Sequence, residues 1–496
     1  MTITYHSTRN NQLSYTASEA ILAGIAPDGG LFVPSTIPQL TLALEDLAKK
    51  SYQEIAFHIL KAFLTDFTDD EINESIQVYN QEKFDTALIT PLVEAGHDHY
   101  LELFHGPTIA FKDMALSILP KLMTISAKKN DSQEDIVILT ATSGDTGKAA
   151  LVGFADVPNT HIIVFYPKDG VSDIQEKQML TQKGDNVHVV SIEGNFDDAQ
   201  TKVKELFADK ELAADLHANK LRFSSANSIN IGRLIPQIIY YVYAYGQLVD
   251  QLSIQAGDAI NVVVPTGNFG NILAAYYAKE MGLPINKLVV ASNENNVLTD
   301  FFKTGTYNRN RDFILTSSPS MDILVSSNLE RLLYHLASED TQLVASYMAS
   351  LSKDGLYEVT ADMLEKTVEF YAGFASEQAV SDQIKHTFEE SNYVLDPHTA
   401  VAAYVANDYR SKTNDQTTTV IASTASPYKF PLAVLEATNS NFKETSLEDS
   451  LSQLRDLTGI AFPNAIEEAL HDPIRHHTSV KVNEMKDIVK EKLGIQ

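Results

Sequence analysis

Apolar segments of strand length alternate with segments of helix length over much of this chain, and this alternation constrains the fold more than any other feature. The segments DIVILTAT, HIIVFYP and NVHVVSI follow one another at intervals of about 20 to 25 residues, the spacing of short β-α-β units. INVVVPT, NKLVVAS and TTTVIAST come later in the chain. Apolar strands that alternate with helices are typical of parallel sheets flanked by helices. The sequence therefore predicts an α/β fold with two parallel-sheet domains.

The first 95 residues depart from this pattern and predict a mostly helical unit. Residues 13–24 have the composition of a short helix that stops at its final glycine, and the turn residues PDGG then lead into the strand-like LFV. Residues 295–395 combine polar loops with helical stretches and show no obvious strand. The expected domains are an N-terminal domain over residues 1–95, a small α/β domain over 126–219, and a large α/β domain formed by 96–125 and 220–496 that carries a 295–395 insertion.

Charge and cysteine content exclude several classes of function. The chain has 65 acidic and 38 basic residues, for a formal net charge of −27, which opposes binding to nucleic acid or to an anionic membrane surface. The absence of cysteine excludes disulfides, thiolate metal sites and a cysteine nucleophile, and fits a reducing compartment. No signal-peptide pattern or membrane-spanning apolar run is present in the sequence. We therefore expect a cytoplasmic protein that binds neither nucleic acid nor membrane.

Two groups of polar residues favour structural roles. Asp396-Pro397-His398-Thr399 has an aspartate and a proline in the order that begins a helix, so it predicts a helix start. The histidines near the C-terminus are too loosely grouped for a metal site. We expect no metal site; the histidines concerned are His471, His476 and His477.

The segment HGPTIAFKDMAL places Lys112 among apolar residues. Apolar surroundings favour the neutral form of a lysine, and the neutral amine is the form that condenses with an aldehyde to a Schiff base. The structural alternative is a lysine at a helix start that extends its amine toward solvent. This segment alone does not decide between the two.

Two loops between a strand and a helix contain residues suited to anions. TGNFGN, after the strand NVVVP, lacks the dinucleotide pattern G-x-G-x-x-G, but its glycines allow close approach of a phosphate to a helix start. In TATSGDTGK, Thr142 stands where a P-loop has its first glycine and Ala149 stands at the magnesium-binding position, which excludes a nucleoside triphosphate site. We expect this loop to bind a carboxylate or a small phosphate. For each loop alone, an ordinary turn or helix cap remains an alternative.

The combination of these features indicates pyridoxal-phosphate chemistry. A Schiff-base lysine, a glycine-rich anion loop, a hydroxyl-rich loop, and a hydroxyl at the end of the strand TTTVIAST are the parts that such an enzyme requires. The motif series also resembles that of the threonine synthase family, a member of the tryptophan-synthase-like fold type II group, from the first thirty residues to about residue 430. The motifs are GIAPDGGLFVP, HGPTIAFKD, TATSGDTGKAA, SANSINIGRLIPQ, PTGNFGN, SPSMDI with SNLERLL, and DPHTAVAAY.

The resemblance implies a fold type II core with an added N-terminal domain, pyridoxal 5'-phosphate as cofactor, and conversion of O-phosphohomoserine and water to threonine and phosphate. Lys112 would form the Schiff base and move protons, and a second loop would bind the substrate carboxylate. The implied cofactor-binding residues are Lys112, Gly267, Asn268, Phe269, Gly270, Asn271 and Thr424. The implied carboxylate-binding residues are Thr142, Ser143, Gly144 and Thr146.

A substrate with its own phosphate requires a second anion site, distinct from the one for the cofactor. Hydroxyl, amide and guanidinium groups suit a phosphate, and SSANSINIGR supplies all three. A structural helix start is the alternative for this segment. The candidates for the substrate phosphate are Ser225, Asn227, Asn230, Arg233 and Lys148.

Asp145 departs from the wider fold group, which commonly has asparagine at this position. A carboxylate there would repel an anionic substrate unless it is protonated or turned toward a donor. We therefore expect that Asp145 does not contact the substrate carboxylate directly.

Two other functions remain open from the sequence. A serine or threonine dehydratase would share the lysine and the glycine loop but would need no second phosphate site. A non-catalytic binding protein on the same fold would be expected to lack the lysine or the glycine loop, and both are present. The sequence leaves the oligomeric state open between a monomer and a homodimer.

Overall fold

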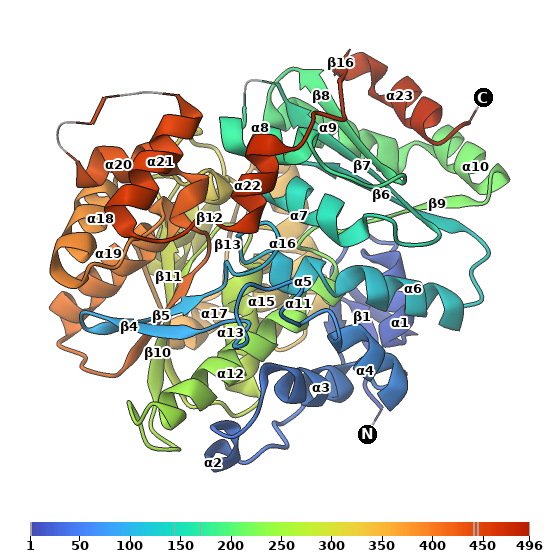
Figure 1. The fold of residues 1–496 in the computed structure, drawn as a ribbon. Coiled ribbons are helices and arrows are strands. Elements are labelled where there is room, and N and C mark those ends of the chain that lie inside the picture. Colours follow the sequence, from blue (N-terminus) through green and yellow to red (C-terminus); the bar gives the residue numbers. More distant parts are fainter. Residues whose placement is uncertain (1, 143, 169, 440–441, 444–445, 496) are drawn as a thin grey trace.

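The computed structural model describes residues 2–142, 144–168, 170–439, 442–443 and 446–495. Two largely parallel sheets, of six and five strands, form its framework, and helices pack against both (Figure 1). The predicted α/β class is confirmed. In the six-stranded sheet the order is β14 (Phe370–Phe374), β11 (Ile285–Ser292), β10 (Ile260–Pro265), β15 (Thr419–Ser423), β5 (Asp98–Glu102) and β4 (Leu92–Ala95). In the five-stranded sheet it is β16 (Thr478–Lys481), β8 (Val187–Glu193), β7 (Thr160–Pro167), β6 (Asp135–Ala141) and β9 (Leu221–Ser224).

The six segments that the sequence predicts as strands are β6, β7, β8, β10, β11 and β15. Their valine- and isoleucine-rich centres are buried, as expected for parallel strands that are covered on both faces. All neighbouring strands in the two sheets pair in parallel except β4 and β5, which pair antiparallel. The carboxyl ends of the parallel strands therefore lie along one edge of each sheet, where α/β proteins place ligands.

The N-terminal part combines a small sheet with helices. Its antiparallel sheet has the order β2 (Asn10–Tyr15), β1 (Tyr5–Ser7) and β3 (Phe32–Pro34). Thr16 and Glu19 form a capping box at the start of the predicted short helix, and Gly24 ends it in a left-handed conformation with φ of 74°. The helices here are α1 (Ala17–Ala23), α2 (Leu44–Leu47), α3 (Tyr52–Phe63) and α4 (Asp69–Ile76).

Residues 295–395 contain strands that the sequence pattern did not indicate. The sequence shows no obvious strand here, yet β12 (Thr306–Asn308) and β13 (Leu356–Glu358) form a two-stranded sheet and β14 extends the six-stranded sheet at its edge. β14 is the short segment FYAGF, which has no alternating or continuous β-branched run. Its Gly373 lies so close to Val405 that an added Cβ would be 2.8 Å from that side chain. Packing against α19 (Pro397–Thr413) therefore selects this strand, rather than local propensity.

The five-stranded sheet takes in strands from beyond residues 126–219. β9 follows that range directly, whereas β16 comes from the C-terminal part of the chain and pairs in parallel with β8. The remaining helices up to residue 250 are α5 (Asp113–Leu116), α6 (Leu119–Lys129), α7 (Asp145–Phe154), α8 (Asp173–Leu180), α9 (Phe196–Ala208), α10 (Lys210–Ala218), α11 (Ile231–Leu234) and α12 (Pro236–Asp250). Those beyond it, besides α19, are α13 (Gly270–Glu280), α14 (Val297–Thr304), α15 (Leu329–Leu336), α16 (Thr341–Asp354), α17 (Ala361–Glu365), α18 (Glu377–Ser391), α20 (Pro431–Thr438), α21 (Leu447–Thr458), α22 (Asn464–His471) and α23 (Met485–Lys492).

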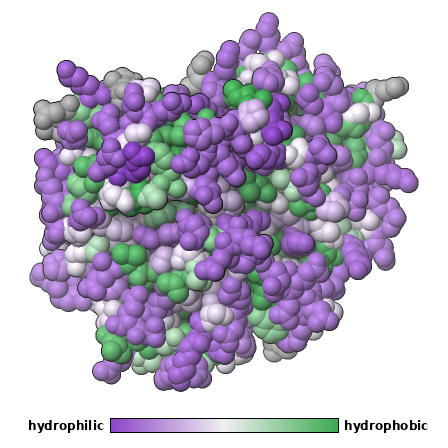
Figure 2. Space-filling view, viewed as in Figure 1, coloured by the Kyte–Doolittle hydropathy of each residue, from purple (hydrophilic) through white to green (hydrophobic). Residues whose placement is uncertain are grey.

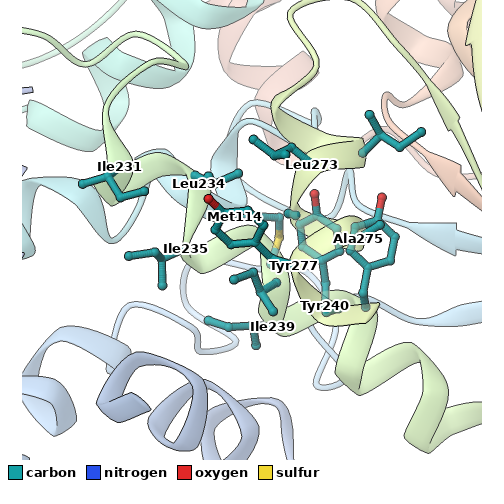
Figure 3. Close-up of a cluster of buried hydrophobic side chains, with 14 of the residues drawn as sticks. Met114, Ile231, Leu234, Ile235, Ile239, Tyr240, Leu273, Ala275 and Tyr277 are labelled. Carbon is teal, nitrogen blue, oxygen red and sulfur yellow. The ribbon is translucent and has the colours of Figure 1, made fainter. Parts of the chain in front are cut away.

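One buried hydrophobic cluster joins α5, α11, α12 and α13. Figure 3 shows Met114 of α5 among side chains of α11 and α12, with Leu273 and Tyr277 of α13 beside them. All of these side chains are fully buried. Because the elements share one core, the positions of α5 and of the start of α13 are coupled. Polar side chains cover most of the outer face in Figure 2, with only scattered apolar patches.

Candidate active site

Lys112 lies at the start of α5, beside the carboxyl end of β15. The backbone N–H of Phe111 donates to the carbonyl oxygen of Thr424 (2.8 Å), and Ala110 forms an isolated bridge with Ala425. Ile109, three residues before the lysine, has a left-handed φ of 52°, which is strained for a β-branched residue. Burial lowers the pKa of Lys112 to about 8, and its Nζ donates to Ser320 Oγ (3.3 Å).

A buried polar network holds the loop that carries Ser320. The carboxylate of Asp322 accepts from Thr316 Oγ1 (2.7 Å) and N (3.0 Å), Asn293 Nδ2 (2.7 Å) and Asn295 Nδ2 (2.9 Å). Asn293 and Asn295 follow the end of β11, so the network ties the loop to the edge of the six-stranded sheet. Ser320 is thereby held within hydrogen-bond distance of Lys112.

His398 contacts the backbone of Ser320. The N–H of Ser320 donates to His398 Nε2 (3.3 Å), so this ring nitrogen carries no proton and Nδ1 donates to Asp396 Oδ1 (2.8 Å). Asp396 is also the N-cap of α19 and accepts from the backbone N–H of His398 and Thr399, which confirms the predicted helix start. The contact of His398 with Ser320 is a role that the sequence did not indicate.

The glycine-rich loop connects β10 to α13 and lies against the same Ser320. A Cβ on Gly267 would be 2.8 Å from the carbonyl oxygen of Ser320, so only glycine fits there. Phe269 is the N-cap of α13, with a left-handed φ of 64°. Asn271 Oδ1 accepts from the hydroxyl of Tyr241, and its buried Nδ2 has no hydrogen-bond partner among the described residues. This helix start therefore combines free backbone N–H groups with an unused side-chain donor, which suits a phosphate.

Contacts to a neighbouring loop hold the middle of this glycine-rich segment. The carbonyl oxygen of Asn268 accepts from the backbone N–H (3.1 Å) and Nδ2 (2.9 Å) of Asn328, and Ser327 Oγ donates to Asn268 Oδ1 (3.1 Å). Gly270, the first residue of α13, is buried. Thr424 is buried at the end of β15, and its N–H donates to Thr399 Oγ1 (3.3 Å).

The loop between β6 and α7 meets the same centre through Asp145. Thr142 Oγ1 accepts from the N–H groups of Gly144 (3.0 Å) and Gly147 (2.9 Å) and so shapes the loop. Gly144 has φ of 128°, and a Cβ there would be 2.4 Å from the side chain of Gln175. Thr146 is partly buried. Ser143 lies outside the described residues.

Both carboxylate oxygens of Asp145 contact hydrogen-bond donors. Its Oδ1 contacts Nζ of the fully buried Lys429 (2.7 Å) and accepts from Gln175 Nε2 (2.9 Å), and its Oδ2 accepts from Ser320 Oγ (3.2 Å). Burial would raise the pKa of Asp145, but Lys429 and Lys112 outweigh it and hold that pKa well below its usual range. The carboxylate is thus ionised and turned toward donors.

The candidates for the substrate phosphate differ in their free donors. Asn230 uses its Nδ2 group on the carbonyl oxygens of Ile21 (3.0 Å) and Ser225 (2.9 Å) and its Oδ1 on the N–H of Gly232, so its side chain has no donor left and its role is structural. Arg233 is buried, and burial lowers its pKa to about 10. One Nη of Arg233 donates to the carbonyl oxygen of Ala226 (2.9 Å), while its Nε has no partner among the described residues.

The other phosphate candidates lie at the edges of this group. Ser225 Oγ accepts from the N–H of Asn227 (3.1 Å), and Asn227 is partly exposed. Burial lowers the pKa of Lys148 to about 8, and its Nζ donates to Gln182 Oε1.

Sequence reasoning missed Ser320, His398, Lys429 and Gln175. Ser320 belongs to the motif SPSMDI, which contributed to the family resemblance but to which the sequence pattern assigned no chemical role. Lys429 follows the strand end of β15 by six residues and has no pattern around it that signals burial beside a carboxylate. Its role depends on a contact between parts of the chain more than 280 residues apart, which no local pattern encodes.

The assembled groups fit pyridoxal phosphate. An amine with a lowered pKa suits the aldehyde, the start of α13 with the unused Asn271 Nδ2 suits the phosphate, and Thr424 supplies a hydroxyl residue beside the lysine segment. Among the residues that the structure describes, no helix is long and apolar enough to cross a membrane.

Comparisons with known proteins agree with this geometry. Residues 4–78 match the family model "Threonine synthase N terminus", residues 88–424 match "Pyridoxal-phosphate dependent enzyme", and residues 399–459 match "Threonine synthase, C-terminal". Together the three models cover most of the chain, and the second alone spans more than half of it.

Relatives and solved structures support the same assignment. The threonine synthase of Schizosaccharomyces pombe is 38% identical over 470 residues, which cover 88% of this chain and 90% of the relative. That of Saccharomyces cerevisiae is 37% identical over 488 residues, covering 91% and 93%. A crystal structure of threonine synthase from yeast superposes with a TM-score of 0.87 at 35% identity and covers 99% of both chains. A structure of threonine synthase with bound pyridoxal phosphate, from Brucella melitensis, has a TM-score of 0.84 at 35% identity over 99% of both chains. On the family models and on these full-length relatives, the chain belongs to the pyridoxal-phosphate-dependent threonine synthase family.

Proposed function

We propose that this protein converts O-phospho-L-homoserine and water to L-threonine and phosphate, and that the residues assembled around Lys112 carry the reaction. The observation that supports this most directly is the position of Ser320. Its hydroxyl accepts from Lys112 Nζ (3.3 Å), and its carbonyl oxygen lies against Gly267. One residue thus joins the candidate Schiff-base lysine to the candidate phosphate loop.

Bound pyridoxal phosphate would supply an electron sink that stabilises negative charge on the substrate carbons. Lys112 removes and returns protons at substrate carbon atoms, beginning at Cα. With its pKa lowered to about 8, roughly a tenth of the free amine is neutral at pH 7, far more than for an ordinary lysine, and the neutral form is the one that acts as a general base. Residues 267–271 would hold the cofactor phosphate at the start of α13, and Thr424 would supply a hydroxyl to the cofactor.

The loop at residues 142–146 binds the substrate carboxylate at the start of α7. Because Asp145 is paired with Lys429 and Gln175, its charge is compensated and the loop can accept an anion. Arg233 is our first candidate for the substrate phosphate, since its buried Nε is unused and its charge is near enough to Lys112 to lower the pKa of that amine. Ser225, Asn227 and Lys148 are further candidates, whereas the structural bonds of Asn230 remove it from this set.

The decisive experiment measures both products. The purified protein is supplemented with pyridoxal phosphate and incubated with O-phosphohomoserine, and threonine and inorganic phosphate are quantified together. We expect equal amounts of both. Phosphate accompanied by 2-oxobutyrate would show elimination without addition of water, and the absence of both products would favour a dehydratase or a binding protein.

Lys112→Ala tests the role of the lysine in the same assay. We expect turnover to fall by at least about three orders of magnitude, because both the Schiff base and the proton transfers are lost. Lys129→Ala is the matched control, since Lys129 pairs with Glu71 on the contact between α4 and α6, outside the candidate site (2.9 Å). Activity that survived in Lys112→Ala, with the control unchanged, would contradict the assignment.

We further propose that the protein works in the cytoplasm, a setting that fits its lack of cysteine. Cell fractionation with an antibody to the protein tests this location. The choice between monomer and homodimer is open to light scattering of the purified, cofactor-loaded protein.

A further inference from the structure

Lys429 contacts the carboxylate of Asp145 directly, and Lys112 is linked to the same carboxylate through the hydroxyl of Ser320. Lys429 is the last residue of the short 3-10 helix Pro427–Lys429, and its side chain is completely buried. Its Nζ contacts Asp145 Oδ1 (2.7 Å) and donates to the carbonyl oxygen of Thr108 (3.1 Å). The other oxygen of Asp145 accepts from Ser320 Oγ, and that hydroxyl accepts from Lys112 Nζ. A continuous chain of contacts therefore runs from Lys429 through Asp145 and Ser320 to Lys112.

We propose that Lys429 is a positioning residue that, by pairing with Asp145, sets how much of that carboxylate's charge acts on the nitrogen of Lys112. The inference rests on the proposed function and deepens it. The contacts of Lys429 Nζ are with Asp145 and with the carbonyl oxygen of Thr108, so Lys429 acts on Lys112 through Asp145 and through its own nearby charge. The pairing has a second effect. Because Lys429 compensates the charge of Asp145, that carboxylate does not repel the substrate carboxylate at residues 142–146.

The charged groups around Lys112 give this proposal a definite sign. Lys112 is faced by Asp145 of α7, Arg233 of α11 and Lys429; Asp145 favours its charged form, whereas Arg233 and Lys429 oppose it. Lys429 also interacts electrostatically with two other charged groups, Asp113 of α5 and Lys148 of α7. The carboxylate of Asp113 accepts hydrogen bonds from Thr108. His398 meets this group only through the backbone of Ser320.

Removal of Lys429 and removal of the charge of Asp145 therefore shift the pKa of the Lys112 nitrogen in opposite directions. Without Lys429, the uncompensated charge of Asp145 and the loss of a nearby cation both favour the protonated nitrogen. Without the charge of Asp145, protonation is disfavoured. A residue needed only for packing would not produce two shifts of opposite sign.

The test uses the holoenzyme and follows the absorbance of bound pyridoxal phosphate against pH, because this spectrum reports protonation of the Lys112 nitrogen bonded to the cofactor. In Lys429→Met we expect the midpoint of the spectral pH transition to move up by about one pH unit, and in Asp145→Asn to move down by a similar amount, as is typical of a nearby buried charge. Lys429→Arg keeps the positive charge, so its spectral pH midpoint should equal that of the wild-type protein. Lys429→Gln keeps a donor without the charge and serves if Lys429→Met does not fold; it should also move the midpoint up.

Steady-state kinetics provide the second measurement. We expect Lys429→Met to raise KM for the phosphorylated substrate several-fold, more than it lowers kcat, because Asp145 would then repel the substrate carboxylate. Lys129→Met is the matched control and should change neither the midpoint nor KM.

An unchanged midpoint in Lys429→Met and Lys429→Gln, or shifts of the same sign for Lys429→Met and Asp145→Asn, would overturn the proposal. Failure of the inference is distinguishable from failure of the proposed function. Equal yields of threonine and phosphate with no spectral shift would refute only the role of Lys429. Opposite spectral shifts without threonine formation would refute only the proposed reaction.

Discussion

At the scale of single residues, the candidate site depends on charges that are buried and only partly compensated. Among the described residues, Lys112 Nζ donates to the hydroxyl of Ser320, and the carboxylate of Asp145, which favours the charged form of Lys112, already pairs with Lys429. Desolvation consequently dominates, and the pKa of Lys112 falls from 10.5 to about 8. A chemically useful amine is thus obtained at the expense of stability.

This cost predicts a stability change with pH. Between about pH 8 and 10.5, an unfolded chain protonates Lys112 while the folded protein does not, so the contribution of this residue to stability rises with pH across that window and is unfavourable below it. In the cofactor-free protein, Lys112→Met should therefore raise the free energy of unfolding at pH 7 by roughly 1–3 kcal/mol. The advantage should shrink as the pH approaches 10.5. Denaturant unfolding of both proteins at several pH values measures it, and a gain that was independent of pH would contradict the assigned cause.

At the scale of elements, the sequence pattern predicts six of the strands, but it predicts the loops between them only in part. β6, β7, β8, β10, β11 and β15 have apolar runs that local pattern detects, and the loops after β6 and β10 have glycines and hydroxyls that signal anion binding. The 314–322 loop has no such signal, since its shape comes from Asn293, Asn295 and Asp322, which meet only after folding. Ser320 was therefore invisible as a partner of Lys112, although its motif carried the family resemblance.

The contact between the glycine-rich loop and the 314–322 loop predicts a strong effect for Gly267→Ala. The added methyl group would lie 2.8 Å from the carbonyl oxygen of Ser320 and 3.3 Å from Cα of Met321, both backbone atoms that cannot turn aside. We expect pyridoxal phosphate to bind at least about tenfold more weakly, because a displacement of about 1 Å at such a site is costly. Cofactor titration by absorbance checks this. Unchanged affinity in a variant with an unchanged melting temperature would show that the two loops separate without consequence.

At the scale of the whole molecule, contacts between distant segments complete the structure. Arg9 pairs with Glu330 (2.8 Å), and the fully buried Arg331 donates to the carbonyl oxygens of Phe32 and Ile229, so the N-terminal part is bound to α15 and the core beside it. Local sequence patterns predict the α/β class, but they do not predict these contacts between segments that are far apart in the sequence. The domain limits at residues 95, 126 and 219 remain predictions, and the strand β16 joins a sheet that the sequence assigned to an earlier part of the chain.

The C-terminal part predicts the outcome of a truncation. Met485 and Val489 of α23 are fully buried in the same hydrophobic cluster as Val190 and Leu212, and β16 covers the edge of β8. A chain that ends at residue 477 would expose this cluster and leave β8 paired only with β7, as an open edge of the sheet. We expect a lower melting temperature and aggregation on warming, measured by differential scanning fluorimetry and light scattering. A truncated protein that melted like the full chain and stayed monodisperse would show that the five-stranded sheet is complete without β16.

The pairing of β16 with β8 also has a consequence for how the protein is made. Across this pair of strands, Ser191 Oγ donates to the carbonyl oxygen of Thr478, which lies 287 residues later in the sequence. At typical rates of synthesis, β8 waits roughly 15–60 s before its neighbour has been translated. During that interval the nascent chain presents an open strand edge with an apolar face behind it. We expect a chaperone that recognises extended apolar segments to associate with the chain on the ribosome, and to leave once the last strand has been translated.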